Sequence, residues 1–372
     1  TEHWIRDFLH TPVNHTPGTT YMYNSVGSSI LSAIIVKKTG MSMHEYLKPR
    51  LYDKIGIFSD NHRWMKMPDG CEVGGGGLFA TTEDNLRLMK LYADGGVWEG
   101  ERILDDEYVK RATTLQNESA TEAKNNPLAK DNFVGYGYQI WMCRPKGVYR
   151  ADGAMGQFTI VVPDKDMIIA ITENASGAHW AQTTLDVMWE FLERIENHPA
   201  KEENTEKSER LKNRMGRLAL PNPKCAPYSP IVANIEGRQW RVIDGDFYME
   251  DVGVAQHMSG CELPQPIDVF CFHFASDEIV MDWENREEKE RLVIATDGSR
   301  RHNTLPGRLI SQVLLSGAWI SENKLEVKAR YIETCKEETL LFTFEEKKLK
   351  ITNSTIEFGM QKEIEIFAEA ED

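Results

Sequence analysis

A tyrosine and a serine two residues apart stand at the start of an apolar stretch and could take part in acyl transfer. Tyr23 and Ser25 lie within residues 17–27, and the residues that follow predict a helix ending at Gly40. A phenol can remove a proton from a hydroxyl nucleophile only if its pKa falls from about 10, and nearby positive charge lowers it. We predict that Tyr23 is catalytic and that Ser25 contacts the substrate or a hydrogen-bond partner. The structural alternative makes Tyr23 a packed ring and Ser25 a helix N-cap.

A second group of candidates, Asp152, Gly153 and Ala154, comes at the end of a predicted strand. Glycine has no Cβ, so an acyl group could lie directly against the backbone at Gly153. We predict that all three residues bind the substrate. The alternative for Asp152 is a carboxylate at a turn or strand edge.

Several blocks of residues occur in an order that resembles the serine β-lactamase and penicillin-binding superfamily, in particular class C β-lactamase-related hydrolases. The blocks are Pro17-Gly18-Thr19 with Tyr23-Asn24-Ser25, then Gly75-Gly76-Gly77-Leu78, then residues 96–100, 135–141 and 151–157. Together they cover essentially all of residues 1–197. The resemblance implies an α/β (α+β) fold of the β-lactamase/transpeptidase type, with an antiparallel sheet flanked by helices.

The resemblance also implies an acyl-serine mechanism, in which the backbone N–H of Ala154 is one oxyanion donor. The sequence departs from the family in two places: Ser25 replaces the usual asparagine, and Ala151 replaces the lysine or histidine of the third motif. Strand alternation turns Arg150 to the face opposite Ala151, so we expect Arg150 to be a poor substitute.

The family's Ser-x-x-Lys nucleophile motif is expected upstream of residue 1. The one literal match, Ser321-Glu322-Asn323-Lys324, falls in a polar stretch that predicts a hairpin turn. We therefore expect an N-terminally incomplete domain and an incomplete sheet. Its unpaired edge could associate with the missing N-terminal segment or with another chain.

Changes in composition predict two domains joined by a linker. Residues 198–215 are almost all charged or polar and divide the hydrolase-like residues 1–197 from residues 216–372. Residues 325–331 alternate strictly between apolar and polar, as in a strand with one buried face. Because several such runs follow one another, we predict an all-β barrel or sandwich for 216–372.

Composition excludes some partners and cofactors. The net charge of −15 repels phosphate backbones, and no apolar run reaches the roughly 18 residues that span a bilayer, so we expect neither nucleic-acid binding nor membrane insertion. The six cysteines form no Cys-x-x-Cys pair and predict mostly buried thiols. The ten histidines show no His-x-His or His-x-x-x-His pattern, so we predict no metal and no cofactor. The cellular location stays open: members of the family are often exported, and a cytoplasmic location is an alternative.

These observations favour a serine hydrolase that cleaves an ester, amide or lactam in a small molecule or peptide, with this chain alone inactive. Ala151 and Ser25 also fit a different class, a catalytically inactive β-lactamase-like binding or regulatory module. A third interpretation makes the β-rich domain the functional part, with an apolar ligand inside it.

Overall fold

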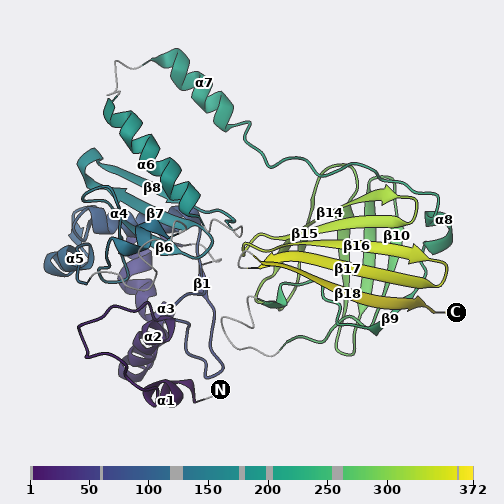
Figure 1. Cartoon of the computed structure of the whole chain (residues 1–372), viewed down its shortest axis with the longest axis horizontal. Helices are drawn as coiled ribbons and strands as arrows, with labels where there is room; N and C mark the ends of the chain where they lie inside the picture. Colours follow the sequence, from purple (N-terminus) through teal and green to yellow (C-terminus); the bar gives the residue numbers. More distant parts are fainter. Residues whose placement is uncertain are drawn as a thin grey trace. The chain divides into compact units, whose positions relative to one another are not determined.

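The computed structural model describes residues 3–58, 62–117, 129–175, 181–197, 204–253, 263–357 and 360–371. Contacts divide the chain into two compact units (Figure 1). The first comprises residues 1–185 with 252–263, and the second comprises residues 186–251 with 264–372.

The first unit begins with helices and ends with a sheet. Its helical elements are α1 (Trp4–Leu9), α2 (Ser25–Thr39), α3 (Met43–Leu47), η1 (Lys48–Tyr52), η2 (Asp53–Ile55), α4 (Thr82–Ala93), α5 (Asp106–Ala112), η3 (Lys130–Phe133) and η4 (Pro163–Lys165). Its strands are β1 (Arg63–Trp64), β2 (Leu78–Phe79), β3 (Val97–Trp98), β4 (Glu101–Arg102), β5 (Trp141–Met142), β6 (Tyr149–Gly153), β7 (Gln157–Val162) and β8 (Met167–Ile171). Helix α6 (Gln182–Asn197) runs across the division between the two units.

Local capping signals set the ends of the helices. The spacing of Ser42 and Glu45 in the sequence predicts a capping box, and the two residues form one at the start of α3. Gly40 ends α2 in the left-handed conformation, as predicted. The N-cap of α2 is Asn24, whose side chain accepts the N–H of Gly27 at 2.8 Å, so the N-cap alternative for Ser25 is wrong.

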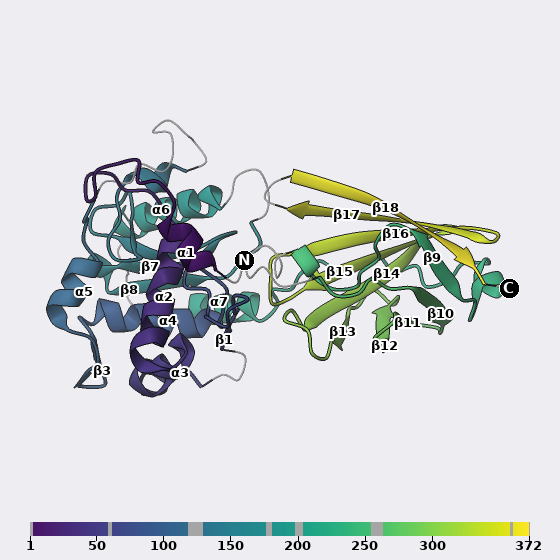
Figure 2. The same cartoon turned by 90° about the horizontal axis from the view of Figure 1, so that it is seen from below.

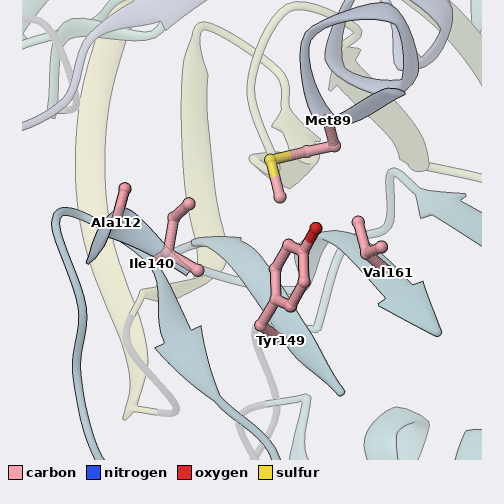
Figure 3. Close-up of a cluster of buried hydrophobic side chains, with 5 residues drawn as sticks. All are labelled: Met89, Ala112, Ile140, Tyr149 and Val161. Carbon is pink, nitrogen blue, oxygen red and sulfur yellow. The ribbon is translucent and has the colours of Figure 1, made fainter. Parts of the chain in front are cut away.

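The sheet of the first unit is antiparallel, with strand order β5-β6-β7-β8. Helix α4 packs on β7 and β8. The core on this face contains residues of α4, α5 and the strands. Figure 3 shows Met89 of α4 pointing toward Tyr149 of β6. Its buried residues are Met89, Ala112, Ile140, Tyr149 and Val161. The predicted antiparallel sheet with flanking helices is confirmed.

The glycine-rich segment before β2 lies against the first turn of α2. A Cβ on Gly74 would lie 2.4 Å from the Ser28 carbonyl oxygen, and one on Gly75 would lie 2.5 Å from that of Ser25. Such distances are shorter than real contacts, so only glycine allows this approach. The sequence also predicts a tight turn before Leu78, and this is confirmed: residues 74–75 form a turn, and Gly77 has a φ of +71°.

The second unit contains α7 (Thr205–Met215), α8 (Val232–Ile235) and the strands of one large sheet. The strands are β9 (Trp240–Asp244), β10 (Val269–Phe274), β11 (Glu278–Glu284), β12 (Lys289–Ala295), β13 (Arg301–Thr304), β14 (Gln312–Ser321), β15 (Lys324–Tyr331), β16 (Glu337–Glu345), β17 (Lys348–Glu357) and β18 (Met360–Ala370). A pairing between Ala295 of β12 and Ser316 of β14 closes the sheet, so the unit is a barrel. Figure 2 shows the long neighbours β17 and β18 along one side.

The barrel interior is rich in aromatic rings. Phe272 and Phe342 meet edge to face with ring centroids 5.2 Å apart, and Trp240 is fully buried beside Phe344. Strand β15 alternates between buried and more exposed residues, as its sequence predicts. Ser321 pairs with Lys324 where β14 turns into β15, so the predicted hairpin for this Ser-x-x-Lys is confirmed.

The polar segment predicted as a linker includes a solvated helix. Helix α7 contains no buried residue, and Asn204 caps it by accepting the N–H of Lys207. Residues 198–203 of that segment lie outside the described residues. No helix in the described part of the chain has both the length and the apolarity to cross a bilayer.

Candidate functional site

Tyr23 lies in an aromatic cluster at the edge of the small sheet. Its ring stacks on Trp141 of β5 with centroids 5.7 Å apart and an interplanar angle of 19°. Tyr136 meets both rings edge to face, and Tyr21 packs on Tyr136 at 4.7 Å. Tyr23 nevertheless keeps 47% of its surface exposed. A ligand could therefore reach the phenol while the cluster holds the ring in place.

The electrostatic surroundings of Tyr23 favour its protonated form. Partial burial raises the pKa of the Tyr23 phenol, and the negative charge of Asp152 raises it further. This direction is opposite to the one that a catalytic phenolate needs. Within the described residues, the charge that acts on Tyr23 is thus an anion.

Ser25 is the first residue of α2 and is exposed. Its carbonyl oxygen accepts the hydroxyl of Ser29 at 3.1 Å. Gly75 approaches the backbone of the same residue closely, so the position of Ser25 is set from two sides. Ser25 comes two residues after Tyr23 of the aromatic cluster.

Asp152 forms an ion pair with Arg150, the next residue but one on β6. The Nε of Arg150 donates to Oδ2 of Asp152 at 2.8 Å. The Arg150 side chain has no solvent exposure, whereas that of Asp152 keeps 22%. The guanidinium also donates to Oδ1 of Asn132 at 3.0 Å and lies over the Trp141 ring at 5.5 Å. Asp152 is thus the counterion of a buried cation, and its position at the end of β6 also faces solvent.

The two faces of β6 are the reverse of what the third-motif interpretation requires. Ala151 packs into the core cluster that contains Met89 and Tyr149. Arg150 lies opposite Trp141 in the β5–β6 register, and directly opposite residues share a face. The expected alternation holds, but Tyr23 lies on the side of Arg150 rather than on the side of Ala151. Arg150 is still a poor cation for Tyr23 because its charge is already paired with Asp152.

Gly153 and Ala154 lie where β6 turns into β7. Gly153 pairs with Gln157, and a Cβ at Gly153 would lie 2.8 Å from the Gln157 Cβ. The strand is internal at its start but extends beyond β5, so residues 151–153 have a pairing partner only in β7 among the named strands. This end of β6 is therefore at an edge of the sheet, whereas its start is internal.

Sequence reasoning missed the residues that hold the cluster together. Gln139 has a positive φ of 61°, accepts the Tyr136 hydroxyl at 3.3 Å and donates to the Ser28 hydroxyl at 3.1 Å. It thereby links the β5 turn to α2. The sequence signal for the aromatic cluster was the spacing of Tyr21 and Tyr23, because alternate residues of an extended segment share a face.

An open hollow lies elsewhere in the first unit, beside α1. Its lining includes His3, Arg6, His10 and Asp69. None of the predicted site residues lines it. The hollow and the aromatic cluster around Tyr23 are therefore lined by different residues.

A model of the family described as "Beta-lactamase" matches residues 2–187, which is half of the chain. The chain therefore belongs to the β-lactamase family of hydrolases. Its first unit has the β-lactamase-like α/β fold, and a closed β-barrel follows in the sequence.

Individual relatives are more distant. A Salmonella paratyphi B protein named "Putative D-alanyl-D-alanine carboxypeptidase" is 24% identical over 153 residues, covering 30% of this chain and 35% of the relative. The chain thus spans about a third of the length of the curated relatives it matches.

Two solved structures have weak similarity to the chain. The octameric penicillin-binding protein homologue from Pyrococcus abyssi is 16% identical with a TM-score of 0.36, covering 95% of this chain and 66% of that chain. A Schistosoma mansoni fatty acid binding protein is 10% identical with a TM-score of 0.28, covering 38% of this chain and 98% of that chain.

Proposed function

We propose that this chain contributes the tyrosine side of the active site of a serine acyl hydrolase, which cleaves an ester, amide or lactam through an acyl-serine intermediate. The observation that carries the proposal is the position of Tyr23. Its ring is held on Trp141 beside the strand that ends at Gly153, and 47% of its surface is still exposed. Family membership supports the class of reaction.

In the proposed reaction, Tyr23 removes the proton of a serine hydroxyl as the serine attacks the carbonyl carbon, and returns it to the leaving group. Water then repeats the sequence and releases the acid. Ser25 contacts the substrate, Gly153 and Asp152 line the acyl group, and the Ala154 N–H is an oxyanion donor. The nucleophile belongs to a Ser-x-x-Lys segment outside these 372 residues, since Ser321 lies in a barrel hairpin.

The proposal requires a cation that the described residues do not supply to Tyr23. Burial and Asp152 both raise the pKa of this phenol. The lysine of the proposed Ser-x-x-Lys segment would oppose them by favouring the phenolate. Without it the phenol stays protonated at neutral pH, so we expect the chain alone to be inactive.

The test uses a fluorophosphonate probe and a fluorescent penicillin on two proteins. One is the 372-residue chain, and the other is the same chain extended by the coding sequence upstream of it. We expect labelling of the extended protein only, at a serine followed three residues later by lysine. Labelling of the 372-residue chain would contradict the assigned roles. The name of the Salmonella relative makes a D-alanyl-D-alanine peptide one substrate to include.

A catalytically inactive binding or regulatory module is the second candidate. Ala151 at the third-motif position and the raised pKa of Tyr23 favour it. The same experiment distinguishes the two: an upstream sequence without Ser-x-x-Lys, together with an absence of labelling in the extended protein, would support the binding module.

A further inference from the structure

Three side chains of different chemistry meet on the outer face of the barrel, at strands β10 and β11. Sγ of Cys271, Nε2 of His273 and a carboxylate oxygen of Asp282 all lie within 4.8 Å of one another. We propose that these residues bind one divalent transition-metal ion, and that zinc is the ion they fit best. This site is independent of the proposed hydrolase function.

Strand geometry brings the three residues together. Phe270 and Phe272 of β10 point into the aromatic interior, so Cys271 and His273 share the opposite face. Asp282 of β11 lies directly across from Cys271 in the antiparallel register. Residues in that relation have neighbouring side chains. The site thus needs only one hairpin, which the barrel holds rigidly.

Two of the three distances between the ligand atoms match a tetrahedral site, and the third, between Cys271 and Asp282, is within 4.8 Å. Nε2 of His273 lies 3.6 Å from Sγ of Cys271 and 3.7 Å from Oδ2 of Asp282. Zinc binds sulfur at about 2.3 Å and nitrogen or oxygen at about 2.0–2.2 Å, which places tetrahedral ligand atoms roughly 3.3–3.6 Å apart. Closing the cluster around an ion therefore requires shifts of only a few tenths of an ångström at these two contacts. Three protein ligands leave a fourth position for water.

The histidine is already oriented by a carboxylate. Nδ1 of His273 lies 2.9 Å from Oε1 of Glu236, and the other oxygen of Glu236 accepts the N–H of Phe274 at 2.8 Å. With the Nδ1 proton on this hydrogen bond, the lone pair of Nε2 faces the cluster. Metal-binding histidines usually have such an outer carboxylate, which fixes the tautomer and increases basicity.

The ligand set selects among metals. A thiolate and an imidazole favour zinc and related ions over magnesium or calcium, which prefer oxygen. On binding, the Cys271 thiol loses its proton to solvent, so the thiolate and the Asp282 carboxylate balance the two positive charges of the ion. Arg291 holds both oxygens of Asp282 at 2.7 and 3.0 Å, and the ion replaces its contact with Oδ2.

The prediction of no metal rests on the absence of His-x-His and His-x-x-x-His pairs from the sequence. A Cys-x-His step on a strand with an aspartate on the next strand contains no such pair. Of the five described cysteines, only Cys143 and Cys271 are buried, so the expectation of mostly buried thiols is wrong for the described residues.

The test titrates the metal-free 372-residue chain with Co²⁺ and then with Zn²⁺. We expect one equivalent of Co²⁺ to give a sulfur-to-cobalt charge-transfer band and tetrahedral d–d bands, which Zn²⁺ abolishes. Cys271→Ser should remove the charge-transfer band, and Asp282→Asn should weaken binding at least about 100-fold. Glu236→Gln, which changes no ligand, should weaken binding by about 10–100-fold. Cys225→Ser, at an exposed cysteine, is the matched control and should change nothing.

Two results would overturn the site. One is a charge-transfer band that disappears with Cys225→Ser, because the metal would then be held adventitiously by an exposed thiol. The other is unchanged affinity in both Asp282→Asn and Glu236→Gln. These two substitutions keep side-chain shape at partly exposed positions, so they decide the question even if Cys271→Ser fails to fold.

Discussion

Arg150 carries its positive charge at a position with no solvent exposure, and Asp152 is the carboxylate that balances it. Removing one partner of such a pair leaves an unbalanced buried charge, which costs about 3–5 kcal/mol. We expect Asp152→Asn to lower the free energy of unfolding by about 3 kcal/mol, the low end because Asn keeps an oxygen acceptor. Chemical denaturation measures this change. Asp164→Asn, at an exposed carboxylate of η4 between β7 and β8, should change it by less than about 0.5 kcal/mol.

Tyr23 and Tyr21 offer a matched pair for testing catalysis. Both belong to the aromatic cluster, but Tyr23 stacks on Trp141 and is the proposed base, while the Tyr21 hydroxyl is buried. In the active, extended protein, Tyr23→Phe should lower kcat by about 10²–10⁴-fold, the usual contribution of a positioned base. Tyr21→Phe should leave kcat within a few-fold. Equal losses in both variants would indicate that the cluster serves packing alone.

At the scale of residues, the sequence predicts which residues lie near the site better than it predicts which side of the strand faces Tyr23. Alternation along β6 shows that Arg150 and Ala151 point to opposite sides, and this is confirmed. Which side contains Tyr23 depends on the packing of Trp141 and on the turn at Gln139, and both are tertiary contacts. A local pattern carries no information about them.

At the scale of elements, helix α2 and the glycine segment depend on each other. A methyl group at Gly75 would lie 2.5 Å from the Ser25 carbonyl oxygen and 2.7 Å from its Cα. Gly75→Ala should therefore displace the first turn of α2 and cost about 1–3 kcal/mol in the free energy of unfolding. Gly216→Ala is the control, because its Cβ would lie 3.5 Å from the Lys212 carbonyl oxygen. Equal stability of the two variants would mean that the segment can move away from α2 without cost.

The contact between α3 and the segment before β1 should respond to pH. Nε2 of His44 and Nδ1 of His62 lie 3.2 Å apart. Burial is the main cause that lowers the pKa of His62 below its usual 6.5, and the charge of the neighbouring His44 lowers it further. The unfolded chain therefore binds more protons between that lowered pKa and about 6.5, so stability rises with pH through this window and is lost as the pH falls.

Thermal unfolding at pH 7.5 and pH 5.5 checks this expectation. His62→Gln should lose less stability than the unchanged chain between these two values. His302→Gln, at an exposed position in the barrel, should behave like the unchanged chain. A pH response that is the same in all three proteins would show that the His44–His62 contact does not titrate.

The elements themselves could largely be predicted, because capping and alternation are local. The capping box at Ser42, the helix end at Gly40 and the alternation of β15 are as predicted. The prediction missed the role of Gly74 and Gly75, because their requirement comes from α2, which is distant in sequence.

At the scale of the whole molecule, closure of the barrel could not be predicted from the sequence. Successive strand patterns predict a β-rich domain but fit a sandwich equally well. The deciding contact is the parallel pairing of Ala295 with Ser316, which joins strands that are not consecutive. The metal site proposed at Cys271 likewise depends on a cross-strand register.

Each unit has a core of its own, around Met89 in the first and around Leu325 and its neighbours in the barrel. Units with separate cores can unfold separately, so we expect two transitions in differential scanning calorimetry of the full chain. Leu325→Ala removes a fully buried side chain and should cost about 2–5 kcal/mol. That loss should lower one transition by roughly 5–15 °C and leave the other in place. Met89→Ala should do the reverse, and a parallel shift of both transitions in either variant would show that the two cores unfold as one.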